Sequence, residues 1–125
     1  MALEFMRSES SASPIEKELV ATNGTEYKHG TLIGYGAAGT AVTSGTEYVY
    51  VGKDFTAKTG DILACVPVLP EYEWKTEFSA DASSLKKGAK VTIAAGKATA
   101  TTASGIFEIL ADGGVTGASI VGRFS

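Results

Sequence analysis

The sequence has almost none of the side chains that most enzymes and metal sites use. It holds one cysteine, Cys65, and one histidine, His29, among 125 residues. A single cysteine cannot form a disulfide within the chain, so the fold depends on its apolar core, and a reducing compartment suits it. One histidine with one cysteine also makes a poor ligand set for zinc. We therefore predict no catalytic residue, no metal and no cofactor.

Long apolar runs and an excess of basic residues are also missing. No segment approaches the roughly 20 apolar residues that span a bilayer, and the first seven residues lack the apolar run of a signal peptide. The 11 basic and 14 acidic residues give a net charge of −3, and no stretch gathers the basic ones. Nucleic-acid binding usually needs such a basic patch to neutralise phosphates. We expect neither a membrane nor a nucleic acid as partner.

Glycine and β-branched residues are abundant, and they favour turn-rich β structure over helix. The chain has 15 glycines, and its length allows one domain. Runs of strand length recur between turn signals, which predicts about seven strands. They cover residues 31–33, 47–51, 61–66, 71–77, 90–94, 105–110 and 118–124. This pattern predicts an all-β fold, a small β-barrel or β-sandwich-like domain.

The strongest periodicity lies in residues 71–77, where apolar and charged residues alternate strictly. Tyr72 and Trp74 fall on one face of this predicted strand. Alternation of this kind is typical of a half-buried strand, so core packing is the favoured interpretation. The alternative is that both aromatics belong to a binding surface, and we keep them as secondary surface candidates.

Three other segments carry weaker signals. Residues 14–20 fit either a short helix or an edge strand, and residues 94–104 fit either a hairpin arm or a loop. One helical turn is expected around residues 83–87, ended by Gly88.

Residues 34–39 match the glycine fingerprint of dinucleotide-binding sites, but the following residues are β-branched and broken by glycine. Because the fingerprint must open a helix, we interpret these glycines as a turn or bulge. Cys65 lies in an apolar run, which favours a buried packing role over a nucleophile paired with His29.

The first 20 residues differ from the rest of the chain. They begin with a polar, serine-rich leader that carries the apolar residues Leu3, Phe5 and Met6. A leader of this kind is typical of an arm that becomes ordered only against a partner. We therefore predict a flexible amino-terminal arm at 1–20 and a β domain at 21–125. An amino-terminal tail without a function is the alternative.

Four segments resemble those of the tailed-phage capsid decoration, or head-cementing, proteins. They are residues 60–63 (GDIL), 85–93 (LKKGAKVTI), 105–110 (GIFEIL) and 117–124 (GASIVGRF), within a similarity that spans residues 25–125. The resemblance implies a small β-tulip-type domain with an extended amino-terminal arm and no enzymatic activity. It also implies that the major capsid protein is the partner, that the chain acts on the capsid exterior of the virion, often as a homotrimer, and that it is in the host cytoplasm during assembly.

These observations together predict a non-enzymatic virion structural protein that binds the outside of the expanded phage capsid and stabilises the lattice. An arm can bury apolar side chains against neighbouring subunits and add hydrogen bonds to an exposed sheet edge. The predicted capsid contacts are Leu3, Phe5, Met6, Pro14 and Ile15. The alternatives are a carbohydrate-binding or adhesion module that uses Tyr72 and Trp74, and a tail-tube or fibre component.

Overall fold

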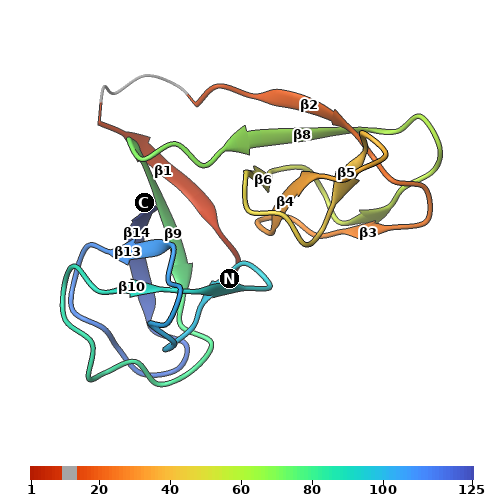
Figure 1. Ribbon diagram of the computed structural model, residues 1–125. Helices are drawn as coiled ribbons and strands as arrows, with labels where there is room; N and C mark the ends of the chain where they lie inside the picture. The colour runs from red at the N-terminus through yellow and green to blue at the C-terminus, as the bar shows by residue number, and fades with distance from the viewer. Residues whose placement is uncertain (10–13) are drawn as a thin grey trace. The chain divides into compact units, whose positions relative to one another are not determined.

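The computed structural model describes residues 1–9 and 14–125, and every regular element in them is a β-strand (Figure 1). The predicted all-β fold class, a small barrel- or sandwich-like architecture, is confirmed. The chain forms two compact units. The first unit combines Met1–Ser13 with Leu69–Ser125, and the second unit is the intervening segment Pro14–Val68. The second unit is thus inserted into the sequence of the first.

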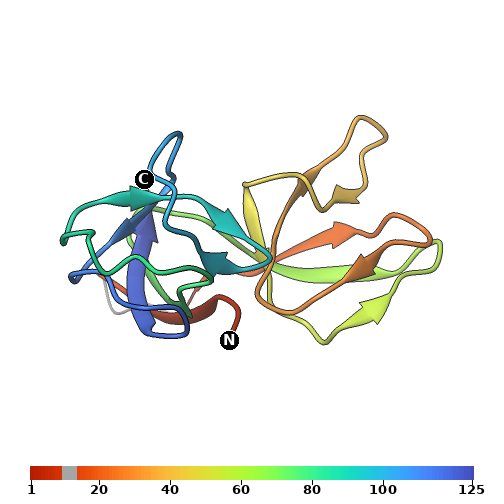
Figure 2. The ribbon, with the colours of Figure 1, turned by 90° about the horizontal axis from the view of Figure 1, so that it is seen from below.

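The first unit is built on one antiparallel five-stranded sheet. In spatial order its strands are β1 (Glu4–Ser8), β9 (Tyr72–Glu77), β14 (Ser119–Phe124), β13 (Phe107–Ile109) and β10 (Lys90–Val91). The hairpin of β11 (Ile93–Ala94) and β12 (Lys97–Ala98) follows β10, and Phe78, directly after β9, bridges to Ala98. This bridge joins the end of β9 to the hairpin that follows the edge strand β10, so the sheet curls toward a barrel (Figures 1 and 2).

Alternation along β9 places its apolar side chains inside the first unit. Tyr72, Trp74 and Thr76 are buried, as the period-two pattern predicts. Phe107 and Phe124 pack against each other edge to face, with ring centroids 5.2 Å apart. The buried Thr76 hydroxyl donates a hydrogen bond to the Gly96 carbonyl oxygen at 2.7 Å, whereas the buried Trp74 Nε1 atom on the same strand has no hydrogen-bond partner among the described residues.

The second unit has its own five-stranded sheet. Its strands, in spatial order, are β2 (Lys17–Val20), β8 (Ile62–Pro67), β6 (Tyr48–Tyr50), β4 (Leu32–Tyr35) and β5 (Ala41–Val42). A bridge between Ala21 and Ala41 links the two outer strands, so this sheet also curls on itself. The short strands β3 (Glu26–Tyr27) and β7 (Phe55–Thr56) form a separate antiparallel pair.

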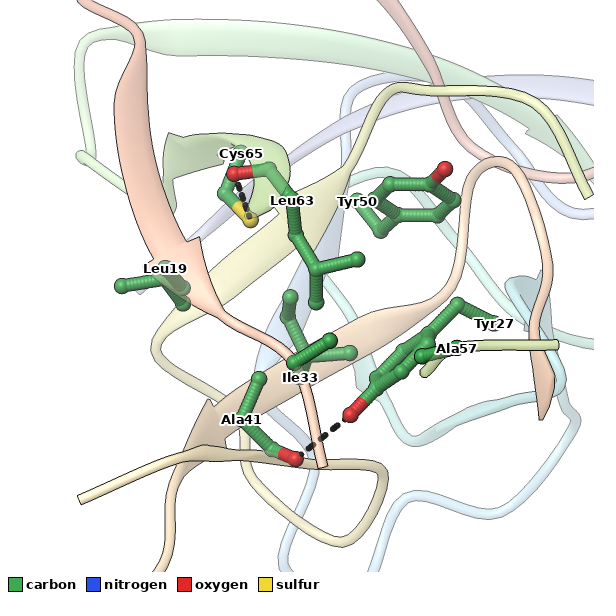
Figure 3. Close-up of a cluster of buried hydrophobic side chains, with 9 residues drawn as sticks. Leu19, Tyr27, Ile33, Ala41, Tyr50, Ala57, Leu63 and Cys65 are labelled. Atoms are coloured by element: carbon green, nitrogen blue, oxygen red, sulfur yellow. Dashed lines mark hydrogen bonds between the residues drawn. The ribbon is translucent and has the colours of Figure 1, made fainter. Parts of the chain in front are cut away.

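The core of the second unit gathers side chains from most of these strands (Figure 3). Its buried members are Leu19, Ala21, Tyr27, Ile33, Ala41, Tyr50, Ala57, Leu63 and Cys65. The Tyr27 hydroxyl donates to the Ala41 carbonyl oxygen at 2.7 Å and accepts from the Thr22 backbone N–H at 2.9 Å. Burial raises the pKa of the Cys65 thiol to about 12, and the predicted packing role of this residue is confirmed.

The three segments with weaker sequence signals form an edge strand, a hairpin and a pair of tight turns. Residues 17–20 form an edge strand, and residues 93–98 form a hairpin whose turn residues Ala95 and Gly96 have positive φ of 51° and 77°. The predicted helical turn at 83–87 is wrong, because two tight turns, closed by hydrogen bonds from Leu85 to Ala82 and from Ala89 to Lys86, occupy this stretch; Gly88 has a φ of +95° in the second turn. Residues 34–39 end β4 and form a turn, with no helix after them, as expected.

The structure divides the chain differently from the predicted arm at 1–20 and domain at 21–125. β1 is extended, as predicted, but it pairs with β9 as part of the first unit, and Leu3 before it is fully buried. The physical reason is that β9 offers a sheet edge on which the apolar leader residues can be buried. Residues 14–20 belong instead to the second unit. Residues 10–13 of the predicted arm lie outside the described residues.

Candidate functional site

The predicted contact residues of the leader differ in their exposure. Leu3 is fully buried and exposes no apolar surface to a partner in this structure, so its predicted contact stays a prediction. Phe5 is half-buried and packs edge to face against Tyr72 and Trp74, with ring centroids 5.4 and 5.6 Å apart. Met6 is 49% exposed. Of these three residues, Met6 offers the most apolar surface to a partner.

The remaining two predicted contacts lie in the second unit, before its edge strand β2. Pro14 is half-buried, and Ile15 is 61% exposed. Exposed apolar side chains continue into the strand, where Val20 pairs with Ile62 of β8 and both are about half exposed. Sequence reasoning missed Val20 and Ile62, because only the strand register places these two residues side by side.

Tyr72 and Trp74 do not form a surface, which corrects their place as secondary surface candidates. Their side chains are 2% and 0% exposed, and the core interpretation is confirmed. The Trp74 indole packs between aromatic rings, 5.6 Å from Phe5 and 6.4 Å from Phe124 by ring centroids. The carbohydrate-binding alternative therefore loses the two side chains on which it rested.

A row of alternating charge crosses the sheet of the first unit. The strand registers pair Arg7 with Glu73, Arg123 with Glu108, and Glu108 with Lys90. Extending the β9–β14 register by one residue also places Arg123 opposite Glu73. The signs thus alternate from the edge strand β1 to the edge strand β10, with a cation at each end. Side chains opposite each other on one face of a sheet lie close enough to interact.

Ion pairs hold much of this row in place. The Arg7 Nε atom lies 3.1 Å from Glu73 Oε1, and the Arg123 Nε atom lies 3.5 Å from Glu108 Oε1. Arg123 Nη1 also donates, at 2.8 Å, to Oε1 of Glu9, the residue directly after β1. Exposed ion pairs of this kind contribute only about 0.2 to 1 kcal/mol each. They matter here because they orient the two guanidinium groups.

An open depression of about 580 Å³ lies on the same unit. Its lining residues are Met6, Arg7, Glu73, Lys87, Leu110, Val121 and Arg123. Three cations and a single carboxylate surround three apolar side chains, although the whole chain has a net charge of −3. The basic residues are dispersed in the sequence, at positions 7, 87 and 123, so no stretch of sequence revealed this cluster.

A second open depression of about 520 Å³ has the opposite character. It is lined by Glu9, Leu69, Pro70, Glu71, Glu108, Arg123 and Ser125. Carboxylates predominate there, and Arg123 is the residue that lines both depressions. The first unit therefore presents adjoining surfaces of different charge, which is a common device for fixing the orientation of a partner.

The described residues contain no cluster of histidine, cysteine, aspartate and glutamate that could hold a metal ion. Within residues 1–9 and 14–125 there is also no helix of the length and apolarity needed to cross a membrane. The His29 ring lies against the Gly52 carbonyl oxygen, with Nδ1 3.0 Å away, and the Cys65 thiol contacts the Leu63 carbonyl oxygen at 3.7 Å. Neither His29 nor Cys65 lines one of the two depressions described above.

No protein-family model matches the chain, and no curated protein is significantly similar to it. The resemblance to capsid decoration proteins therefore stays a prediction that depends on the four segments described above.

Proposed function

We propose that this chain is a non-enzymatic virion structural protein that binds the outside of the expanded phage capsid and stabilises its lattice. In this proposal the chain binds the major capsid protein and forms homotrimers on the capsid exterior. The observation that carries it is Met6, an apolar side chain left 49% exposed on the edge strand β1.

Edge strand β1 is suited to attachment. It pairs with β9 on one side and is the outermost strand of its sheet on the other, among the described residues. An edge strand presents unpaired N–H and C=O groups to which another chain can add a strand. The register of β1 shifts between Phe5 and Arg7, at Met6, and such a bulge discourages unspecific pairing. A specific partner can use both the edge and the Met6 side chain.

The second unit supplies another apolar site. Ile15 and the cross-strand pair of Val20 and Ile62 are exposed at its β2 edge. Two modest contacts on one chain bind more strongly together than either does alone, provided that both can engage at once. A lattice of neighbouring subunits offers repeated sites, and binding to the assembled state alone stabilises that state by mass action.

The experiment mixes the purified full chain with phage heads before and after expansion, assembled from the major capsid protein that we propose as its partner. Cosedimentation should be saturable with expanded heads and absent with unexpanded ones. Met6→Glu should weaken binding, because it places a charge where an apolar contact forms. Val115→Glu is the matched control, since Val115 is an apolar residue of the same unit that is 61% exposed and lies outside the depression.

The absence of binding to expanded heads would refute the proposal. Assembly of the purified chain into rings or filaments would instead support the tail-tube or fibre alternative, and electron microscopy of the same sample detects it.

A further inference from the structure

We propose that the depression lined by Met6, Arg7, Glu73, Lys87, Leu110, Val121 and Arg123 binds an acidic peptide segment that carries an apolar residue. The inference rests on the proposed function for the source of that segment, which is the capsid surface. The chemistry of the segment follows from the depression itself.

The charges of the depression favour an anion. Arg7 and Arg123 are held by glutamates, whereas Lys87 stands in an exposed turn before β10. The Lys87 backbone N–H donates to Asp112 Oδ1 at 2.9 Å, which fixes the turn without using the ammonium group. Arg7 is paired with Glu73, and Arg123 is paired with Glu9 and Glu108, so an approaching carboxylate meets the Lys87 ammonium group first and the two oriented guanidinium groups beside it. Charge complementarity of this kind selects partners and speeds their association.

The apolar part of the depression favours a side chain such as leucine. Val121 and Leu110 are half-buried neighbours, tied by a hydrogen bond of 2.9 Å from the Leu110 N–H to the Val121 carbonyl oxygen. Met6 adds a flexible thioether that adapts to the shape of a partner. A depression of about 580 Å³ has room for several residues, so one segment can place carboxylates on the cations and an apolar side chain between them.

The row of alternating charge also favours an acidic partner over a second copy of this chain. It ends in a cation at both sheet edges, Arg7 on β1 and Lys90 on β10. A copy that joined either edge in line with the row would bring cation against cation, which is destabilising. An added strand with a glutamate or aspartate opposite Arg7 continues the alternation.

The test is an NMR titration of the isotope-labelled full chain with a blocked hexapeptide of alternating glutamate and leucine. Resonances of Lys87, Val121 and Arg123 should shift in a saturable way. Lys87→Glu should lower the affinity about fivefold to tenfold at low ionic strength, because it replaces attraction by repulsion at an exposed site. Lys86→Glu is the matched control, with the same charge change on an adjacent exposed residue outside the depression, and should leave the affinity unchanged.

Three results would overturn the inference: shifts elsewhere on the molecule, an equal response to a hexapeptide of alternating lysine and leucine, or an equal loss with Lys86→Glu. Sedimentation of the chain alone could give a fourth result that overturns the inference. Self-association that Lys87→Glu abolishes would assign the depression to a second copy of the chain.

Binding of the same variants to expanded heads separates this inference from the proposed function. If heads bind the wild type and Lys87→Glu equally, the depression is not the attachment site, and the inference fails while the function stands. If heads do not bind the wild type, the proposed function fails, and the peptide titration alone decides whether the depression binds acidic segments.

Discussion

Replacement of Leu3 tests how the first residues of the chain are held. The Leu3 side chain is fully buried directly before β1. Leu3→Ala removes buried methyl groups and leaves a cavity, and such substitutions cost about 2 to 5 kcal/mol. We expect a value within this range, about 3 kcal/mol. With a urea dependence of about 1.5 kcal/mol per molar, the unfolding midpoint should fall by about 2 M.

The assay is urea unfolding followed by tryptophan fluorescence. Trp74 is the only tryptophan and is buried in the first unit, so its emission reports the unfolding of that unit. Ile15→Ala is the control, because Ile15 is exposed and belongs to the second unit, and its effect should stay within about 0.5 kcal/mol. If Leu3→Ala is as mild as Ile15→Ala, the leader is not packed on the first unit and the reasoning is refuted.

Other predictions concern single groups. Hydrogen bonds from the amino-terminal ammonium group and from Lys97 lower the pKa of Glu77 from 4.5 to about 2. Its stabilising contribution should therefore be complete above pH 4.5 and be lost as the pH falls through 2, and an ordinary midpoint in an NMR titration of the carboxyl would contradict this. Tyr27→Phe leaves the Thr22 N–H without its partner, while the Ala41 carbonyl oxygen keeps the hydrogen bond from the Thr22 hydroxyl, so the substitution should cost about 1 kcal/mol in urea unfolding followed by circular dichroism; no loss would contradict the hydrogen bonds of the Tyr27 hydroxyl. Cys65, with its pKa raised to about 12 by burial, should react with iodoacetamide at pH 8 only after unfolding, and rapid reaction in the folded protein would contradict its burial.

The sequence predicts those parts of the fold that depend on local patterns. Alternation in residues 71–77 correctly places Tyr72 and Trp74 inside, because successive side chains of a strand point to opposite faces. The same holds for Cys65, whose apolar neighbours predict its burial. The sequence also predicts the turn at residues 34–39, because the residues that follow it do not favour a helix.

Pairing between distant strands explains what local patterns did not predict. The leader resembles an arm when it is considered alone, and only the edge of β9 turns it into a strand, with Arg7 bonded to Glu73. The division into two units has the same origin, because strand-like runs do not reveal which runs pair. Lys87, in the turn before β10, and Arg123, on β14, line the same cationic depression only in the folded chain. A basic cluster of this kind has no signature in a linear sequence.

Cryo-electron microscopy of expanded heads saturated with the full chain tests the central claim most directly. We expect density for the chain on the outer surface of the shell, with the exposed edge of β1 and Met6 turned toward the capsid subunits. A bare shell at saturating concentration of the chain would contradict the claim that this protein acts by adhesion to the assembled capsid.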